Sequence, residues 1–200
     1  PPHFPNFASE LSELIAWCNN INTLWAPDVR QLEDGRYYYY YCAWNNRGYM
    51  GLAVSDNVEG PYTDLGEIFK TGEAGYNASN HPNTIDAALY EDPQENLWMV
   101  YGSYSGGIFI LPIDEATGFP EQSDVWGEHV IGGNHSRIEA PYMSYNPETG
   151  YYYLWLSFGG LDAVGGYNIR VARSTSPEGP FYDALGTDMA TVRGTGSLSN

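Results

Sequence analysis

The chain has 200 residues, a size that suits one domain, and its 8 lysine and arginine residues are set against 25 aspartate and glutamate residues. A formal net charge of −17 excludes the basic face that nucleic acids and anionic membranes require, and it also disfavours a polyanionic substrate. No stretch of 18 apolar residues predicts a transmembrane helix, and the N-terminal residues do not have the form of a signal peptide.

The first predicted element is a short helix that begins at Ser9, with two glutamates in its first turns where the helix dipole favours acids. Its apolar residues recur at helical spacing up to Cys18 and would form one face. Cys18 and Cys42 are the two cysteines of the chain, and whether they form a disulfide stays open. Because no Cys-x-x-Cys motif is present, the sequence does not predict a zinc cluster.

From Trp25 onward the sequence predicts strands and turns. Residues 29–32 and the tyrosine run at 37–41 flank an Asp-Gly hairpin turn, and a third strand follows at 49–55. A Glu-Gly-Pro-aromatic segment at 59–62 then ends the unit. The tyrosine run does not alternate with polar residues, so we expect it to fill the space between two packed layers.

The same order of elements returns twice along the chain. Strands are predicted at 97–101 and 108–113 in the second unit, and at 151–155 and 168–174 in the third. A second Glu-Gly-Pro-aromatic ending lies at 178–181. Units of several short strands at this period are typical of the blades of a β-propeller, so the predicted fold is all-β with about three blades.

Each unit also opens with a related tetrapeptide. It reads Trp-Ala-Pro-Asp at 25–28, Asp-Ala-Ala-Leu at 86–89 and Glu-Ala-Pro-Tyr at 139–142. The innermost strands of successive blades meet at the central axis of a propeller. The pattern therefore predicts that the first residues of the three copies, Trp25, Asp86 and Glu139, converge on one axial pocket. Three unrelated edge strands with coincidental spacing are the alternative.

Two carboxylates at matching axial positions favour glycoside hydrolysis. In that reaction one carboxylic acid protonates the leaving oxygen, while a second carboxylate activates water or attacks carbon. The acid must hold its proton near neutral pH, which burial and a neighbouring anion promote, and Asp86 could supply that anion for Glu139. Arg137 lies two residues before Glu139 and would act in the opposite direction. Either acid taken alone could equally be an ion-paired or capping residue.

Four segments, at 25–29, 83–87, 102–108 and 135–142, resemble glycoside hydrolase family 43 in the same order, and residues 151–174 resemble the same family. The similarity is greatest to its endo-α-1,5-L-arabinanases. The resemblance implies a five-bladed propeller, of which residues 1–200 would be a single catalytic-type domain that is incomplete at both ends. It also implies an inverting acid–base mechanism that cleaves the α-1,5-L-arabinofuranosidic bonds of arabinan.

The resemblance also implies roles for individual residues. Glu139 corresponds to the general acid, and Asp86 to the aspartate that modulates the pKa of the acid and orients the substrate. His135 could contact substrate or the water of an axial metal, although a lone histidine is more often structural. The candidates for substrate binding are Trp25 as a sugar-stacking platform, Asn83, Ser103, His135 and Arg137.

The general base of the family has no counterpart among these residues. It lies in a His-Asp-Pro type motif upstream of the Trp-Ala-Pro-Asp segment, and no such motif is found in this chain. Asp28 is a poor substitute, because it lies three residues past the axial position and should face the other side of its strand. The axial calcium of the family is likewise implied by resemblance alone, since its main ligand, a histidine on a late blade, has no match here.

We therefore expect an extracellular glycosidase that acts on arabinan, a neutral plant polysaccharide, with a leader for secretion outside these residues. The missing blades, or another chain, would close the propeller and supply the base. A β-xylosidase or an α-L-arabinofuranosidase of the same fold, and a non-catalytic carbohydrate-binding propeller, are the alternatives. A His-Asp-Pro motif ahead of Pro1 would favour the enzyme, and its absence would favour the binding protein.

Overall fold

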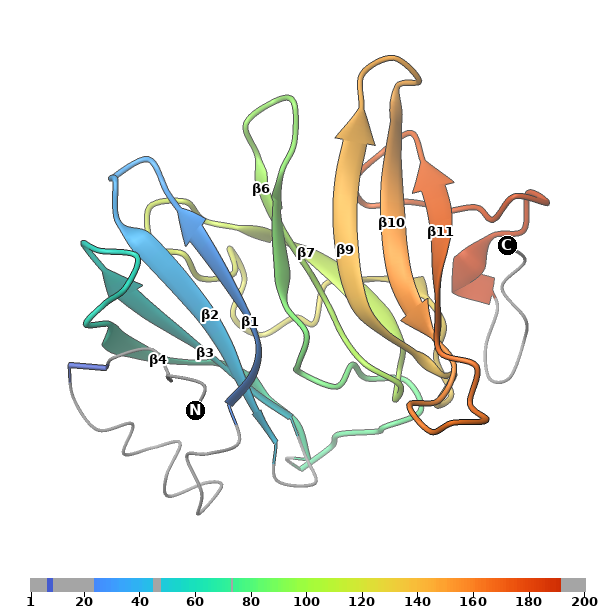
Figure 1. Ribbon diagram of the computed structural model, residues 1–200, viewed down its shortest axis with the longest axis horizontal. Helices are drawn as coiled ribbons and strands as arrows, with labels where there is room; N and C mark the ends of the chain where they lie inside the picture. The colour runs from blue at the N-terminus through green and yellow to red at the C-terminus, as the bar shows by residue number, and fades with distance from the viewer. Residues whose placement is uncertain (1–6, 9–23, 45–47, 73, 192–200) are drawn as a thin grey trace.

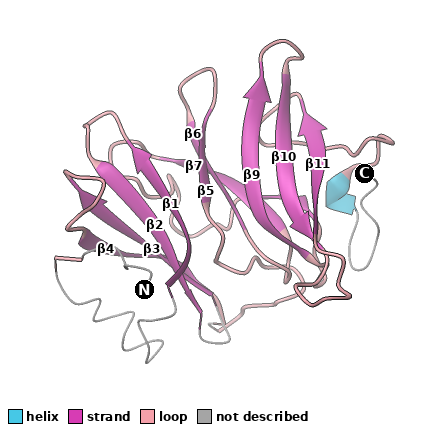
Figure 2. Ribbon diagram, in the orientation of Figure 1, coloured by secondary structure: helices cyan, strands magenta, loops and turns pink. Residues whose placement is uncertain are grey.

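The computed structural model describes residues 7–8, 24–44, 48–72 and 74–191, which form three antiparallel sheets that stand side by side in chain order (Figure 1). The expected helix from Ser9 lies outside the described residues. Figure 2 shows strands and loops throughout, apart from the short 3₁₀ helix η2 (Met189–Thr191). Within the described ranges, no helix is long and apolar enough to cross a membrane.

Each sheet is built from strands that follow one another along the chain. The first contains β1 (Leu24–Gln31), β2 (Tyr37–Trp44), β3 (Gly48–Ser55) and β4 (Thr63–Lys70), in that order. The second contains β5 (Ala88–Glu91), β6 (Leu97–Tyr101), β7 (Ile108–Ile113) and β8 (Glu128–Ile131). The third contains β9 (Ile138–Asn146), β10 (Tyr151–Phe158) and β11 (Asn168–Ser174).

These sheets are consecutive blades of a propeller, as the repeat predicted. The first strands of successive sheets contact one another, β1 with β5 and β5 with β9. Strands β4 and β8 were not expected. In the first blade, the Glu-Gly-Pro-aromatic segment at 59–62 was expected to end the unit but leads into β4. In the third blade the corresponding strand is reduced to a bridge between Arg173 and Tyr182.

Strand β2 is buried on both faces, which confirms the expectation for the tyrosine run. Tyr38 and Tyr40 belong to the core between the first and second blades. Tyr39 and Tyr41 pack on the opposite face, in a cluster that Phe7 also contacts. Cys42, on the same strand, is a free and buried thiol, and burial raises its pKa to about 12. Its suggested partner Cys18 lies outside the described residues.

One sheet face stays uncovered by the described residues. Exposed apolar side chains of β9, β10 and β11 form a strip on the third blade, in which Trp155 is the register partner of Tyr142 and of Val171. Its members are Tyr142, Trp155, Ile169 and Val171. The opposite face of the same blade is closed by the core that joins it to the second blade.

Candidate active site

A β-bulge interrupts the inner strands at the end that faces the axis. In β1 the bulge follows Trp25, and in β9 it follows Glu139. The next residue in each case, Ala26 or Ala140, has a left-handed backbone with φ of 40° or 49°. A bulge of this kind re-aims the side chains on either side of it. Trp25 and Glu139 are thus presented by the same local backbone on two different blades.

The middle blade also has a left-handed residue here, displaced by one position from the tetrapeptide pattern. Its left-handed residue is Asp86, with φ of 60°. The residue before it, Ile85, accepts a hydrogen bond from the Gly102 N–H. By backbone, Ile85 is the counterpart of the residues that precede the other two bulges, and Asp86 is the counterpart of the left-handed alanines. The alignment that placed Asp86 level with Trp25 and Glu139 is wrong by one residue.

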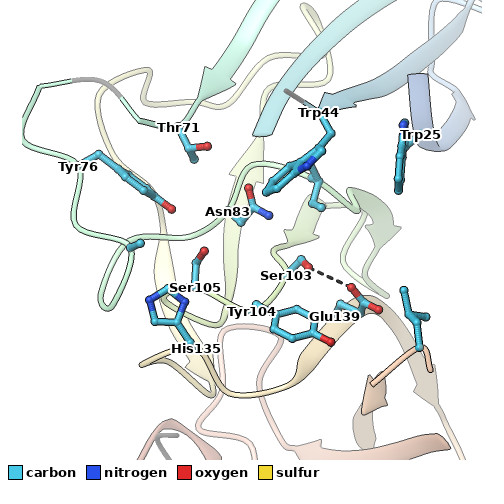
Figure 3. Close-up of a pocket in the computed structure, with 13 residues that line it drawn as sticks. Trp25, Trp44, Thr71, Tyr76, Asn83, Ser103, Tyr104, Ser105, His135 and Glu139 are labelled. Carbon is cyan, nitrogen blue, oxygen red and sulfur yellow. Dashed lines mark hydrogen bonds between the residues drawn. The ribbon is translucent and has the colours of Figure 1, made fainter. Parts of the chain in front are cut away.

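A pocket of about 520 Å³ lies where the three inner strands converge. Ile85 lines it beside Trp25 and Glu139, as their shared backbone position requires. Figure 3 shows Tyr76 and His135 on one side of the pocket, and Trp25 and Glu139 on the other. Five of the predicted site residues line the pocket, namely Trp25, Asn83, Ser103, His135 and Glu139. Asp86 and Arg137 are not part of its lining.

Glu139 is held by two hydroxyl groups, one on each carboxylate oxygen. The Ser103 hydroxyl donates to Oε2 at 3.1 Å (Figure 3), and the Tyr167 hydroxyl donates to Oε1 at 2.8 Å. Ser103 lies in the loop after β6 and is buried, whereas Tyr167 lies just before β11 and is 45% exposed. Two blades therefore fix the orientation of this carboxylate.

Asp86 does not line the pocket, and its side chain reaches the next blade. Its Oδ2 accepts a hydrogen bond of 3.0 Å from the backbone N–H of Ala140, the residue that follows Glu139. Burial raises the pKa of Asp86 to about 6; the Ala140 N–H opposes this rise and the charge of Glu139 adds to it. Asp86 thus positions the strand that carries Glu139, and the two carboxylates interact electrostatically.

Asp28 makes the same kind of contact one blade earlier. Its Oδ2 accepts a hydrogen bond of 2.6 Å from the backbone N–H of Leu89 in β5, and its Oδ1 accepts one of 2.9 Å from Val29. Asp28 does not line the pocket, in agreement with the expected direction of its side chain. A carboxylate from one blade therefore binds the inner strand of the next at both blade junctions.

The two remaining candidates lie on the loop between β8 and β9. His135 lines the pocket, and its backbone N–H donates to the Ser105 carbonyl at 2.8 Å. Arg137 is exposed, and its guanidinium lies over Gly160, where an added Cβ would come within 3.2 Å of Nη1. Arg137 is thus placed at the rim, against the loop between β10 and β11.

Sequence reasoning missed the aromatic wall of the pocket and the second donor to Glu139. Trp44, Tyr76 and Tyr104 line the pocket, and the Tyr104 hydroxyl donates to the Gly159 carbonyl at 3.2 Å. Trp44 is the last residue of β2, so the aromatic run of that strand could have indicated that Trp44 lines the pocket. Tyr76 and Tyr104 lie in loops, where no periodic pattern marks them.

The described residues do not by themselves fit the calcium ion that the resemblance implies. Within those ranges, no group of three or more histidine, cysteine, aspartate or glutamate side chains could hold a metal ion. The carboxylates near the axis also have other partners: Glu139 accepts two hydroxyl bonds and Asp86 accepts a backbone N–H.

Comparison with known proteins is consistent along the whole chain. Residues 9–197 match the family described as glycosyl hydrolases family 43. Extracellular endo-α-(1→5)-L-arabinanase 2 of Bacillus subtilis is 54% identical over 205 residues, which cover 98% of this chain and 44% of the relative. An extracellular endo-α-(1→5)-L-arabinanase of Thermotoga petrophila is 48% identical over 208 residues, covering 97% and 44%.

Solved structures agree with the sequence comparison. A family 43 glycoside hydrolase from Bacillus licheniformis superposes with a TM-score of 0.90 at 53% identity, covering 97% of this chain and 47% of the other. An endo-1,5-α-L-arabinanase from Thermotoga petrophila gives a TM-score of 0.88 at 47% identity, covering 95% and 46%. These neighbours are five-bladed β-propellers, and the present chain spans less than half of their length.

Proposed function

The chain belongs to family 43 of the glycosyl hydrolases, and from this premise we propose that the protein containing it hydrolyses the α-1,5-L-arabinofuranosidic bonds of arabinan with inversion at the anomeric carbon. The observation that carries the proposal is the placement of Glu139. It is the one carboxylate among the described residues that line the pocket, and it is held on both oxygens. An acid that must meet a leaving oxygen needs this kind of fixed orientation.

In the proposed reaction Glu139 is the general acid, and Asp86 acts through it. Asp86 holds the backbone beside Glu139, and the carboxylates are close enough to interact. Burial is the main cause of the raised pKa of Asp86, and the charge of Glu139 adds to the rise, because two negative charges at one site repel each other. Glu139 would deliver its proton to the departing sugar oxygen.

The pocket suits a neutral sugar. The side chain of Trp25 lines the pocket and is 55% exposed, and Trp44 and Tyr76 line the same pocket. Flat aromatic rings offer apolar faces on which sugar rings stack, while their polar edges and the nearby amide and hydroxyl groups bind sugar hydroxyls. The relatives named above are described as extracellular, which supports secretion of the present protein as well.

An inverting reaction also needs a second carboxylate on the opposite face of the sugar, about 6.5–9.5 Å from the acid. Asp86 and Asp28 are committed to backbone N–H groups of neighbouring blades. The base is therefore proposed to come from outside the described residues, together with the ligands of any calcium ion. The exposed apolar strip of the third blade gives a further blade a surface to pack against.

The test is an assay of the full-length protein that carries this chain on linear 1,5-arabinan. Arabino-oligosaccharides should appear, and proton NMR of the first products should show the anomer opposite to that of the substrate. Cleavage of β-xylosides with no action on arabinan, or retention of the anomeric configuration, would contradict the proposal.

A further inference from the structure

Tyr167 joins the Glu139 carboxylate to a loop of the third blade. The phenol hydroxyl donates to Oε1 at 2.8 Å, on the oxygen that Ser103 leaves free. Tyr167 is the last residue before β11, so its backbone belongs to the connection from β10. The two donors approach from different blades, and removal of either leaves one carboxylate oxygen without its protein partner.

The loop that presents Tyr167 is closed on itself. Gly160 N–H donates to the Gly165 carbonyl at 3.0 Å, and Asn168 Nδ2 donates to the Gly166 carbonyl at 2.6 Å. At Gly165 an added Cβ would lie 2.3 Å from the Gly160 carbonyl oxygen, so this close approach requires glycine. These contacts fix the position of the backbone from which the Tyr167 side chain extends.

The same loop forms part of the pocket wall. Leu161 lines the pocket and is 76% exposed at its mouth. Gly159 N–H donates to the Arg137 carbonyl at 3.0 Å, and the Gly159 carbonyl accepts the Tyr104 hydroxyl. One loop thus contacts the wall, the rim and, through Tyr167, the carboxylate.

We infer that Tyr167 is a positioning residue for the reaction of this pocket, which holds the Glu139 carboxyl in the direction of the leaving oxygen and stabilises the carboxylate that forms when the proton departs. This inference rests on the proposed function. Burial raises the pKa of Tyr167, so the phenol keeps its proton and remains a donor. A hydroxyl bond to a charged acceptor is stronger than one to a neutral acceptor, and its effect is therefore largest after proton transfer.

Other charged and titratable groups lie on the elements around the pocket. They are Asp86 ahead of β5, Tyr104 after β6, His135 and Arg137 ahead of β9, and Asp162 in the loop after β10. None of them is altered when the hydroxyl of Tyr167 alone is removed. A change of pH dependence in that variant therefore reports the hydroxyl itself.

The experiment compares Tyr167→Phe with the wild type in the full-length protein. One lost bond to a charged acceptor predicts that kcat on arabinan falls about three- to tenfold with little change in KM. Without this donor the carboxyl retains its proton longer, so the alkaline limb of the pH–rate profile should move to higher pH, by up to about one unit. An aryl arabinofuranoside with a good leaving group should lose less activity, since it needs less protonation.

Tyr182→Phe is the matched control, because it removes an exposed phenol hydroxyl from the same blade, away from the pocket. It should leave kcat and the pH profile unchanged. A Tyr167→Phe profile that superimposes on the wild type, or an equal loss on both substrates, overturns the inference. If the wild type does not cleave arabinan, the proposed function fails separately. The inference is then decided by carbon-13 NMR titration of the Glu139 carboxyl, where an unchanged midpoint in Tyr167→Phe overturns it and a higher midpoint supports it.

Discussion

Replacement of Asp86 by asparagine should stabilise the folded protein at neutral pH and impair catalysis. Burial raises the pKa of Asp86 from 3.8 to about 6, a rise of about two units that corresponds to about 3 kcal/mol. Because the pKa of Asp86 is higher in the folded than in the unfolded state, protonated Asp86 contributes to the stability of the folded protein. This contribution is complete below about pH 4 and is lost as pH rises through about 6. Asparagine keeps the shape and the acceptor for the Ala140 N–H but carries no charge. The rise of about two units already includes the bond from the Ala140 N–H to the charged form, so the expected gain is about 3 kcal/mol near pH 7.5.

Urea unfolding of the full-length protein, followed by tryptophan fluorescence at about pH 4, 5.5 and 7.5, measures this effect. The stability difference between Asp86→Asn and the wild type should increase with pH and be absent near pH 4. Asp34→Asn is the control, because the backbone N–H and side chain of Arg36 lower the pKa of this exposed aspartate, and the pH dependence should have the opposite sign. A difference that does not vary with pH, or a loss of stability at pH 7.5, would refute the assignment of a buried, costly charge to Asp86.

Three further outcomes are expected from the geometry. Glu139→Gln should lower kcat on arabinan by about 10²–10⁴-fold and affect a substrate with a good leaving group less, and equal losses on both would exclude Glu139 as the acid. Residues 1–200 produced alone should hydrolyse little arabinan, and robust turnover followed by NMR would show that a carboxylate of this chain acts as base. Asp28→Ala leaves the Leu89 N–H without its partner and should cost about 1–3 kcal/mol in urea unfolding, whereas unchanged stability would show that the blade junction does not depend on this bond.

Local sequence signals were sufficient for most strands. The spans at 108–113 and 168–174 coincide with β7 and β11, because aromatic and β-branched runs bounded by turn residues depend little on distant contacts. Strand β4 was missed because it contains Gly66 and pairs with β3 through two register shifts, so its pattern does not alternate. Strand β8 has four residues, too few for a periodic signal.

The site was predicted less completely, for a reason that lies in the backbone. The tetrapeptides share an alanine after their first residue, which suggested that Asp86 and Glu139 are equivalent. The position of a bulge depends on how a strand pairs with its neighbour, and no residue of the pattern reports the sign of φ. Tyr167 was missed because a loop folds it across its own blade, a contact without any regular spacing in the sequence.

The left-handed bulge also bears on how repeated blades diverge after duplication. In each of the three blades, the residue just before the left-handed residue lines the pocket. The carboxylate that binds the next blade follows at a different distance: Asp86 comes directly after Ile85 in the middle blade, and Asp28 lies three residues after Trp25 in the first. The residue that faces the pocket and the residue that joins two blades are thus different positions of the same segment, so selection can act on one without altering the other. The sequences of such repeated blades are best aligned on the left-handed residue, because the residue types around it differ with the role of each blade.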